Sequence, residues 1–210
     1  MAELSATSNR FDDRRLRLQP DHPGAISRRT ALWLGLAGVL GGVVLIAGDM
    51  LFYFEGASLD FVANMSRAAP ERIIASAVCA LVAAWLYVLG SGQIYFALQP
   101  AAAWLRRTVF LSFVAVMIAY GVVHGAYVAI ATSAKNAAAL GLPPGAAVDL
   151  AVQANDALRL TAYLPFGIFT IFFGFAVWTR RTYYPRWFLL FSPILPFAAQ
   201  DLIVGGLEGE

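Results

Sequence analysis

The run from Leu32 to Phe54, LWLGLAGVLGGVVLIAGDMLFYF, is apolar except for one ionisable residue, Asp49. About 20 apolar residues, at ~1.5 Å per residue, cross the ~30 Å hydrocarbon core of a bilayer. Of the 210 residues, 60% are hydrophobic and 13% are charged, which does not suit a soluble domain of this size. The sequence therefore predicts an integral membrane protein.

Four more apolar segments follow the first one, and we predict an all-α bundle of five transmembrane helices within residues 31–206. The predicted spans are 32–54, 72–98, 108–132, 161–178 and 187–206. Residues 1–30 are polar and basic and are predicted to form a cytoplasmic tail, and residues 207–210 a short polar end.

The segments between the spans are predicted from their polar residues and prolines. Residues 55–71 form a first loop, Arg106 and Arg107 mark a second, and residues 133–144 form a third. Residues 146–160 are polar at several helical positions, so we expect an amphipathic helix outside the lipid. Pro165 is expected to kink the fourth span or to end its first turn.

The distribution of basic residues predicts the orientation. With the tail inside, eleven arginines lie on the inner side, against three arginines and one lysine outside. Such a bias indicates a cytoplasmic amino terminus, here in a bacterial inner membrane. The alternative is a twin-arginine export signal at residues 27–30, but the apolar run is long for a signal and more spans follow.

Three ionisable residues are predicted at a similar depth. Asp49, His124 and Asp201 each lie roughly 5–10 Å outward of the centre of their spans, at ~1.5 Å per residue. A charge at that depth is costly unless it faces protein or water. We therefore expect an outward-facing polar pocket that contains these side chains.

Aromatic residues and one arginine complete the predicted pocket. Tyr120, His124 and Tyr127 are spaced i, i+4, i+7 and share one helix face. Gln93 is interpreted either as a packing contact with another helix or as a ligand contact. The candidate ligand-binding residues are Asp49, Tyr53, Tyr87, Gln93, Tyr120, His124, Tyr127 and Arg159.

Three roles of His124 stay open at this stage. It is a structural residue bonded to Asp49 or to a backbone carbonyl, an acid–base residue oriented by Asp49, or a metal ligand. The metal role lacks partners, because the only other histidine is His22 in the tail. The single cysteine, Cys79, rules out an internal disulfide and any CxxC motif, so no metal and no cofactor is predicted.

Two G-x-x-x-G steps, Gly38/Gly42 and Gly121/Gly125, predict close approach of helices. They join helices within the chain, or they form faces for a homo-oligomer or a membrane partner protein. Membrane lipids and a small amphipathic ligand are the other expected partners. No soluble basic domain is present, so nucleic acid is not expected as a partner.

Four motifs together resemble an uncharacterised family of bacterial multi-spanning membrane proteins, classed as a domain of unknown function. They are GDMLFY at residues 48–53, LYVLGSGQIY at 86–95, GVVH at 121–124 and YPRW at 184–187. The resemblance covers about residues 31–195. It implies no activity, but it implies that Asp49, Tyr53, Tyr87, Gln93 and His124 belong together.

From the sequence we predict a protein that binds or passes a small or lipid-like molecule in the outward-facing pocket. The first alternative is a membrane-embedded enzyme that acts on a lipid or isoprenoid, with His124 and Asp49 as an acid–base pair. The second is a structural or assembly subunit of a membrane complex.

Overall fold

The chain is entirely helical in the part that the structure, a computed structural model, describes: residues 26–53 and 61–191. No strand occurs among these residues. The helices are α2 (Arg28–Tyr53), α3 (Phe61–Arg67), α4 (Pro70–Ala97), α5 (Ala103–Ala139), α6 (Pro144–Trp178) and the 3-10 helix η1 (Arg186–Phe191). The predicted all-α class is confirmed.

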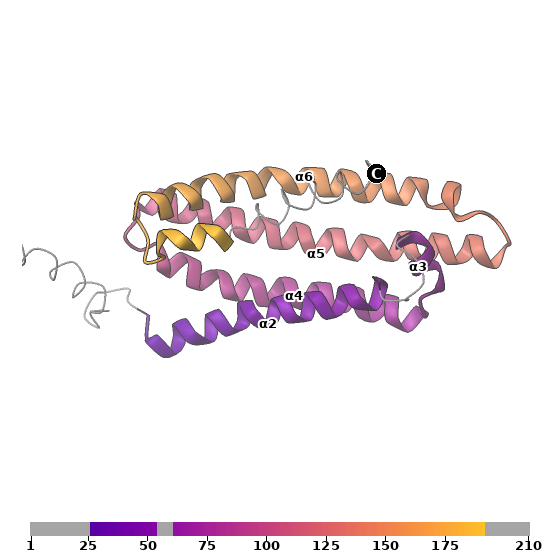
Figure 1. Cartoon of the computed structure of the whole chain (residues 1–210), viewed down its shortest axis with the longest axis horizontal. Coiled ribbons are helices and arrows are strands. Elements are labelled where there is room, and N and C mark those ends of the chain that lie inside the picture. Colours follow the sequence, from indigo (N-terminus) through magenta and orange to yellow (C-terminus); the bar gives the residue numbers. More distant parts are fainter. Residues whose placement is uncertain (1–25, 54–60, 192–210) are drawn as a thin grey trace, which may run out of the picture.

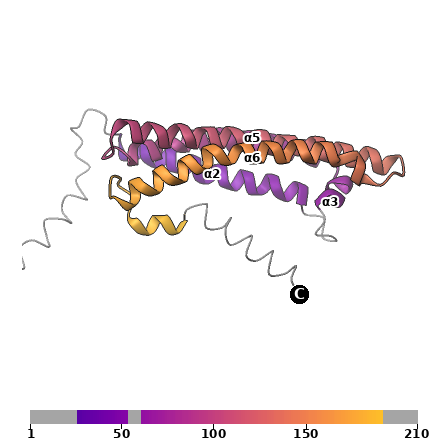
Figure 2. The same ribbon diagram turned by 90° about the horizontal axis from the view of Figure 1, so that it is seen from above.

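The four long helices lie side by side in the order α2, α4, α5, α6 (Figure 1). Each one packs extensively on the next along the chain, and α3 packs on α5. Seen from above, η1 lies beside the end of α6 (Figure 2). Successive long helices run antiparallel, as in an up-and-down bundle.

Four helices in the described residues are long and apolar enough to cross a membrane, where five were predicted. They are Arg28–Leu51, Pro70–Ala97, Ala103–Ala139 and Ala147–Trp178. The fifth predicted span, 187–206, is described only at its start, which is the 3-10 helix η1. The rest of that span, Asp201 included, and residues 207–210 lie outside the described residues.

The second half of the molecule forms a longer helical hairpin than the sequence predicted. The predicted loop 133–144 is helical up to Ala139, and the predicted amphipathic helix at 146–160 is the first part of α6. The turn between the two helices begins where Gly141 adopts φ +67°, and the Leu142 amide donates to the Ala137 carbonyl at 2.9 Å. Polar residues were interpreted as breaks, although a helix tolerates them where it faces water.

Pro165 lies inside α6 and does not end it. A proline inside a helix removes one backbone donor, but the helix on either side of Pro165 is long and continues through it. The helix that contains the predicted fourth span, 161–178, begins earlier, at Pro144. Proline is favoured at that first position, since its missing N–H needs no partner there.

The first connection is partly helical rather than a simple loop. It contains α3, whose C-terminal end is bound by Lys135 of α5. The Lys135 ammonium donates to the Ala68 carbonyl at 2.7 Å and to the Ser66 carbonyl at 3.3 Å. A cation near the carbonyl end of a helix is favourable, so this lysine fixes α3 against α5.

Glycines of α2 form the contact with α4. A Cβ added to Gly90 would lie 2.8 Å from the Gly38 Cα, and one added to Gly48 would lie 2.8 Å from the Cys79 Cβ. The predicted close approach at Gly38 is thus used within the chain. In the second G-x-x-x-G step, a Cβ on Gly121 would lie 3.3 Å from the Ala84 Cβ, whereas no atom of the described residues lies within 4 Å of one on Gly125.

Arginines and aromatic rings gather at one end of the molecule, which we call the arginine end. It comprises Arg28, Arg29, Arg106, Arg107, Arg180, Arg181 and Arg186. Arg106 and Arg107 lie within α5 and not in a loop, contrary to the prediction. The Arg186 Nε donates to the Trp178 carbonyl at 2.9 Å, and Thr182 and Tyr183 bind the Ala97 carbonyl at the end of α4.

The buried apolar core is divided into two clusters along the long axis. One cluster, near the arginine end, contains Leu98, Leu105, Phe173 and their neighbours. The other lies around α3 and contains Met65, Ile130, Val148 and their neighbours. Between the two clusters the helices pack less completely, and the candidate site lies there.

Candidate functional site

Asp49 and His124 are in contact between α2 and α5. The His124 Nε2 lies 3.2 Å from the Asp49 Oδ1. The His124 side chain is 14% exposed and that of Asp49 is 31% exposed. The two residues that the sequence placed only at one depth therefore meet, and they join helices that otherwise touch little.

The second ring nitrogen of His124 also has a partner. Its Nδ1 lies 3.1 Å from the backbone carbonyl oxygen of Tyr120, one turn earlier on α5. The Tyr120 ring stacks on the imidazole, and the Tyr127 ring meets it edge-on, each with centroids 5.8 Å apart. The predicted shared face of α5 thus holds His124 in a fixed orientation.

The α5 face borders a cavity of about 230 Å³, which we call the polar cavity. Its lining consists of polar and aromatic side chains from α5 and α6. The residues are Tyr120, Val123, His124, Tyr127, Arg159, Ala162, Tyr163 and Phe166. Four predicted pocket residues, Tyr120, His124, Tyr127 and Arg159, are brought together here.

A second cavity of about 240 Å³, the apolar cavity, continues toward the arginine end. Residues from all four long helices line it, and the only polar groups among them are the hydroxyls of Tyr87 and Tyr120. They are Leu45, Ala80, Ala83, Ala84, Tyr87, Phe113, Val116, Met117, Tyr120, Gly121, Phe166 and Phe169. Tyr120 and Phe166 line both cavities, so the two are neighbours that share a wall.

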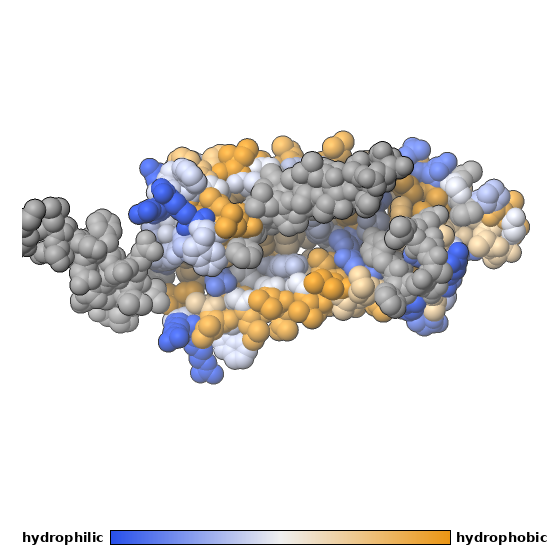
Figure 3. Space-filling model, viewed as in Figure 1, coloured by the Kyte–Doolittle hydropathy of each residue, from blue (hydrophilic) through white to orange (hydrophobic). Residues whose placement is uncertain are grey.

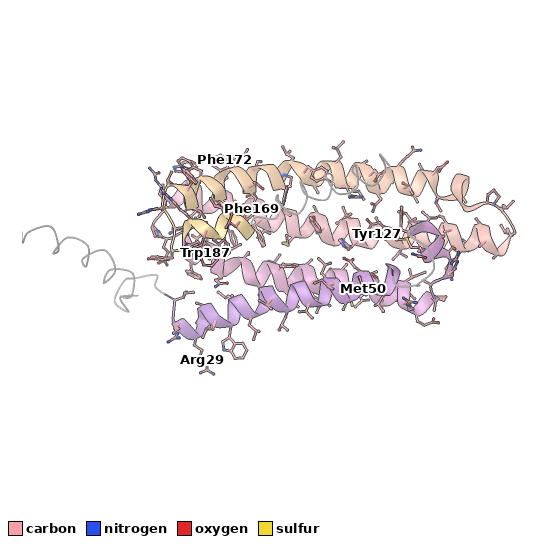
Figure 4. All side chains as sticks on the ribbon, viewed as in Figure 1. Arg29, Met50, Tyr127, Phe169, Phe172 and Trp187 are labelled. Atoms are coloured by element: carbon pink, nitrogen blue, oxygen red, sulfur yellow. The ribbon has the colours of Figure 1, made fainter. Side chains whose placement is uncertain are left out.

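The labelled side chains show how the cavities lie along the bundle. In Figure 4, Tyr127 and Met50 lie at similar levels along the long axis, and Phe169 lies nearer the arginine end, where Arg29 and Trp187 are found. Tyr127 lines the polar cavity and Phe169 lines the apolar cavity. The polar cavity is therefore farther from the arginine end.

Other predicted residues lie elsewhere. Gln93 lies beside Gly35 of α2, where a Cβ on the glycine would be 2.9 Å from the Gln93 Oε1. It borders a shallow surface pocket with Arg28 and does not line either cavity. This placement favours its interpretation as a packing residue. Tyr53 is the last residue of α2, and its side chain lies outside the described part of the chain.

Sequence reasoning missed Tyr163 and Phe166, although a signal was present. Arg159, Tyr163 and Phe166 have the spacing i, i+4, i+7 that identified the face of α5. The prediction assigned Arg159 to the amphipathic segment 146–160 and the other two residues to the fourth span, which separated them. Asn155, also missed, is 2% exposed and donates from Nδ2 to the Val123 carbonyl at 2.9 Å, so it fixes α6 on α5 beside the polar cavity.

No group of three histidine, cysteine, aspartate or glutamate side chains is arranged to hold a metal ion in residues 26–53 and 61–191. Comparison with known proteins gives one match. The sequence model of a family of unknown function (DUF6796) matches residues 27–203. No curated protein and no solved structure matches the chain.

Proposed function

The chain belongs to this family of unknown function, DUF6796, and we propose from its own geometry that it binds a small amphipathic, lipid-like molecule within a membrane. The observation that carries the proposal is the pair of adjoining cavities, one apolar and one lined by His124, Arg159 and tyrosines. Ligand sites are typically concave and mostly apolar, with a few converging polar groups. The two cavities together have this character.

The membrane location is supported by the surface of the helices. Along α2, large apolar side chains are exposed, among them Leu32, Val39, Val43, Ile46 and Met50. Apolar colour runs along the outer side of α2, strongly hydrophilic side chains gather at the arginine end, and paler or hydrophilic side chains show in the hollow between the helices (Figure 3). Soluble monomers rarely expose contiguous apolar surface on this scale, so lipid is the expected neighbour.

We propose that the chain lies in a bacterial inner membrane with its amino terminus in the cytoplasm, and the arginine end supports this orientation. Short cytoplasmic segments carry excess arginine and lysine. Asp49 follows Arg29 by 20 residues, His124 follows Arg107 by 17, and Arg159 precedes Trp178 by 19. At ~1.5 Å per residue these separations are about 30, 26 and 29 Å, which supports a position of the polar cavity toward the outer surface of a ~30 Å core.

Acid–base catalysis by His124 is less well supported than binding. A catalytic histidine oriented by a carboxylate needs its other ring nitrogen for the reacting group. In this chain the Asp49 carboxylate lies at Nε2 and the Tyr120 carbonyl at Nδ1. Both nitrogens face acceptors of the protein, so the geometry favours a structural His124 that lines the polar cavity and joins α2 to α5.

Filling the apolar cavity is expected to remove the ligand. Ala84 is 9% exposed and lines this cavity, so the phenyl ring of Ala84→Phe would occupy the ligand's space. Val122→Phe is the control, because Val122 lines neither cavity and is 51% exposed. Native mass spectrometry from mild detergent measures the bound mass, which we expect in the wild type and Val122→Phe and not in Ala84→Phe.

Met117→Trp narrows the same cavity from a different helix, and it replaces Ala84→Phe in this test if that variant does not fold. Thermal unfolding of each variant shows whether it is folded. A bound mass that is retained in both folded cavity variants, or that is lost equally in Val122→Phe, would contradict binding in the apolar cavity.

A further inference from the structure

The charges around the polar cavity point to the chemical class of the ligand. This inference rests on the function proposed above. We propose that the ligand is a single-chain amphiphile with an anionic headgroup. The headgroup lies against Arg159 in the polar cavity, and the chain passes Tyr120 and Phe166 into the apolar cavity.

The Asp49–His124 pair carries no net charge when its two side chains are hydrogen-bonded. The Tyr120 carbonyl only accepts hydrogen bonds, so the Nδ1 facing it carries a hydrogen. The Nε2 faces the Asp49 carboxyl at 3.2 Å, and a contact between two acceptors there would be repulsive. A hydrogen bond at this contact needs a proton on Nε2 or on the carboxyl, and in either form the pair has no net charge.

Arg159 is then the charge that determines the sign of the polar cavity. Its guanidinium is always protonated. Within residues 26–53 and 61–191, no ion pair joins it to an acidic side chain. Asp156 lies one turn earlier on α6 but does not line the cavity, and the other polar lining groups are His124 and the hydroxyls of three tyrosines. The cavity therefore has a net positive charge, which fits an anionic headgroup.

The apolar cavity limits the rest of the molecule. Its volume of about 240 Å³ is smaller than the ~300–1,000 Å³ of sites for drug-sized ligands. This space suits one acyl or isoprenoid chain better than the two chains of a bilayer phospholipid. Carboxylate and phosphate headgroups share the chemistry that Arg159 recognises, because a guanidinium binds both in a bidentate manner.

The test measures dissociation constants of defined probes with the purified full chain in nonionic detergent. The probes are oleate, 1-oleoyl lysophosphatidate, the uncharged monoolein, and inorganic phosphate as a headgroup without a chain. Arg159→Gln is compared with Arg67→Gln, which removes an exposed arginine of α3 that lines neither cavity. We expect Arg159→Gln to raise the dissociation constants of the two anionic lipids about tenfold or more. Monoolein binding should be unchanged.

The outcomes separate this inference from the proposed function. If Ala84→Phe blocks all three lipids but Arg159→Gln leaves the anionic lipids unaffected, the cavity binds lipid and the anionic headgroup is wrong. Lipid binding that is insensitive to Ala84→Phe would contradict both. Phosphate that binds as tightly as the lysophosphatidate would show a free-anion site and overturn the amphiphile. If Arg67→Gln loses as much affinity for the anionic lipids as Arg159→Gln does, the attraction is a general effect of charge, and the inference of a headgroup bound at Arg159 is overturned.

Discussion

Replacing Gly90 by alanine is expected to lower the thermal unfolding midpoint clearly, whereas replacing Gly38 by alanine is expected to change it little. The two glycines face each other where α2 crosses α4. A Cβ on Gly90 would lie 2.8 Å from the Gly38 Cα and 2.9 Å from its N, whereas a Cβ on Gly38 would lie 3.8 Å from the Gly90 Cα. The first distance forces two backbones apart, and the second is an ordinary contact.

Overpacking of this kind lowers the free energy of unfolding by about 1–3 kcal/mol. For a chain of this length, a loss of about 2 kcal/mol corresponds to a decrease of roughly 4–8 °C in the thermal unfolding midpoint. The measurement is thermal unfolding in detergent, followed by circular dichroism. Gly38→Ala is the matched control, because it adds the same methyl group to the same helix contact. Equal decreases for the two variants would contradict the geometry of the α2–α4 crossing.

The second large effect is expected at the Asp49–His124 contact. Removing either side chain leaves the other partly buried without its partner, at a depth where an unpaired charge is costly. A double-mutant cycle of Asp49→Ala, His124→Ala and the double variant should therefore give a coupling free energy of unfolding of about 1–2 kcal/mol. We do not expect a larger coupling free energy, because Asp49 is 31% exposed and solvent weakens the interaction in such pairs.

Hydrogen exchange of α2 supplies a second readout of the same cycle. The contact joins α2 to α5, whereas the extensive packing of α2 is on α4 alone. Both single variants should increase exchange in the last turns of α2, and the double variant should add little more. Additive losses in stability, with α2 exchange unchanged, would show that the pair does not clasp the two helices.

The sequence predicted the first two long helices well, because unbroken apolar runs and Pro70 determine them. It did not predict the extent of α5 and α6. Lys135, Asp149 and Asp156 lie in helices that continue past the apolar segment, and apolar length alone does not show where such a helix ends. The reason is that a helix end depends on turn geometry, here the positive φ of Gly141.

The candidate site could be predicted only in part from the sequence. The spacing of Tyr120, His124 and Tyr127 revealed one face of α5, and an ionisable residue inside an apolar run drew attention to Asp49. Sequence spacing gives depth and helix face but not which helices are neighbours. The contact of Asp49 with His124, the placement of Gln93 beside Gly35 and the shared wall of the cavities all depend on the packing order.

Photo-crosslinking tests most directly whether the apolar cavity holds the chain of a bound amphiphile. A fatty acid with a diazirine near the end of its chain is bound to the wild type, irradiated, and the labelled residues are identified by mass spectrometry. We expect label on Met117 and Phe169, which line the cavity, and little on their lipid-facing neighbours Ile118 and Ile171. Ala84→Phe should abolish the cavity label. Label confined to Ile118 and Ile171, and unchanged in Ala84→Phe, would contradict the claim.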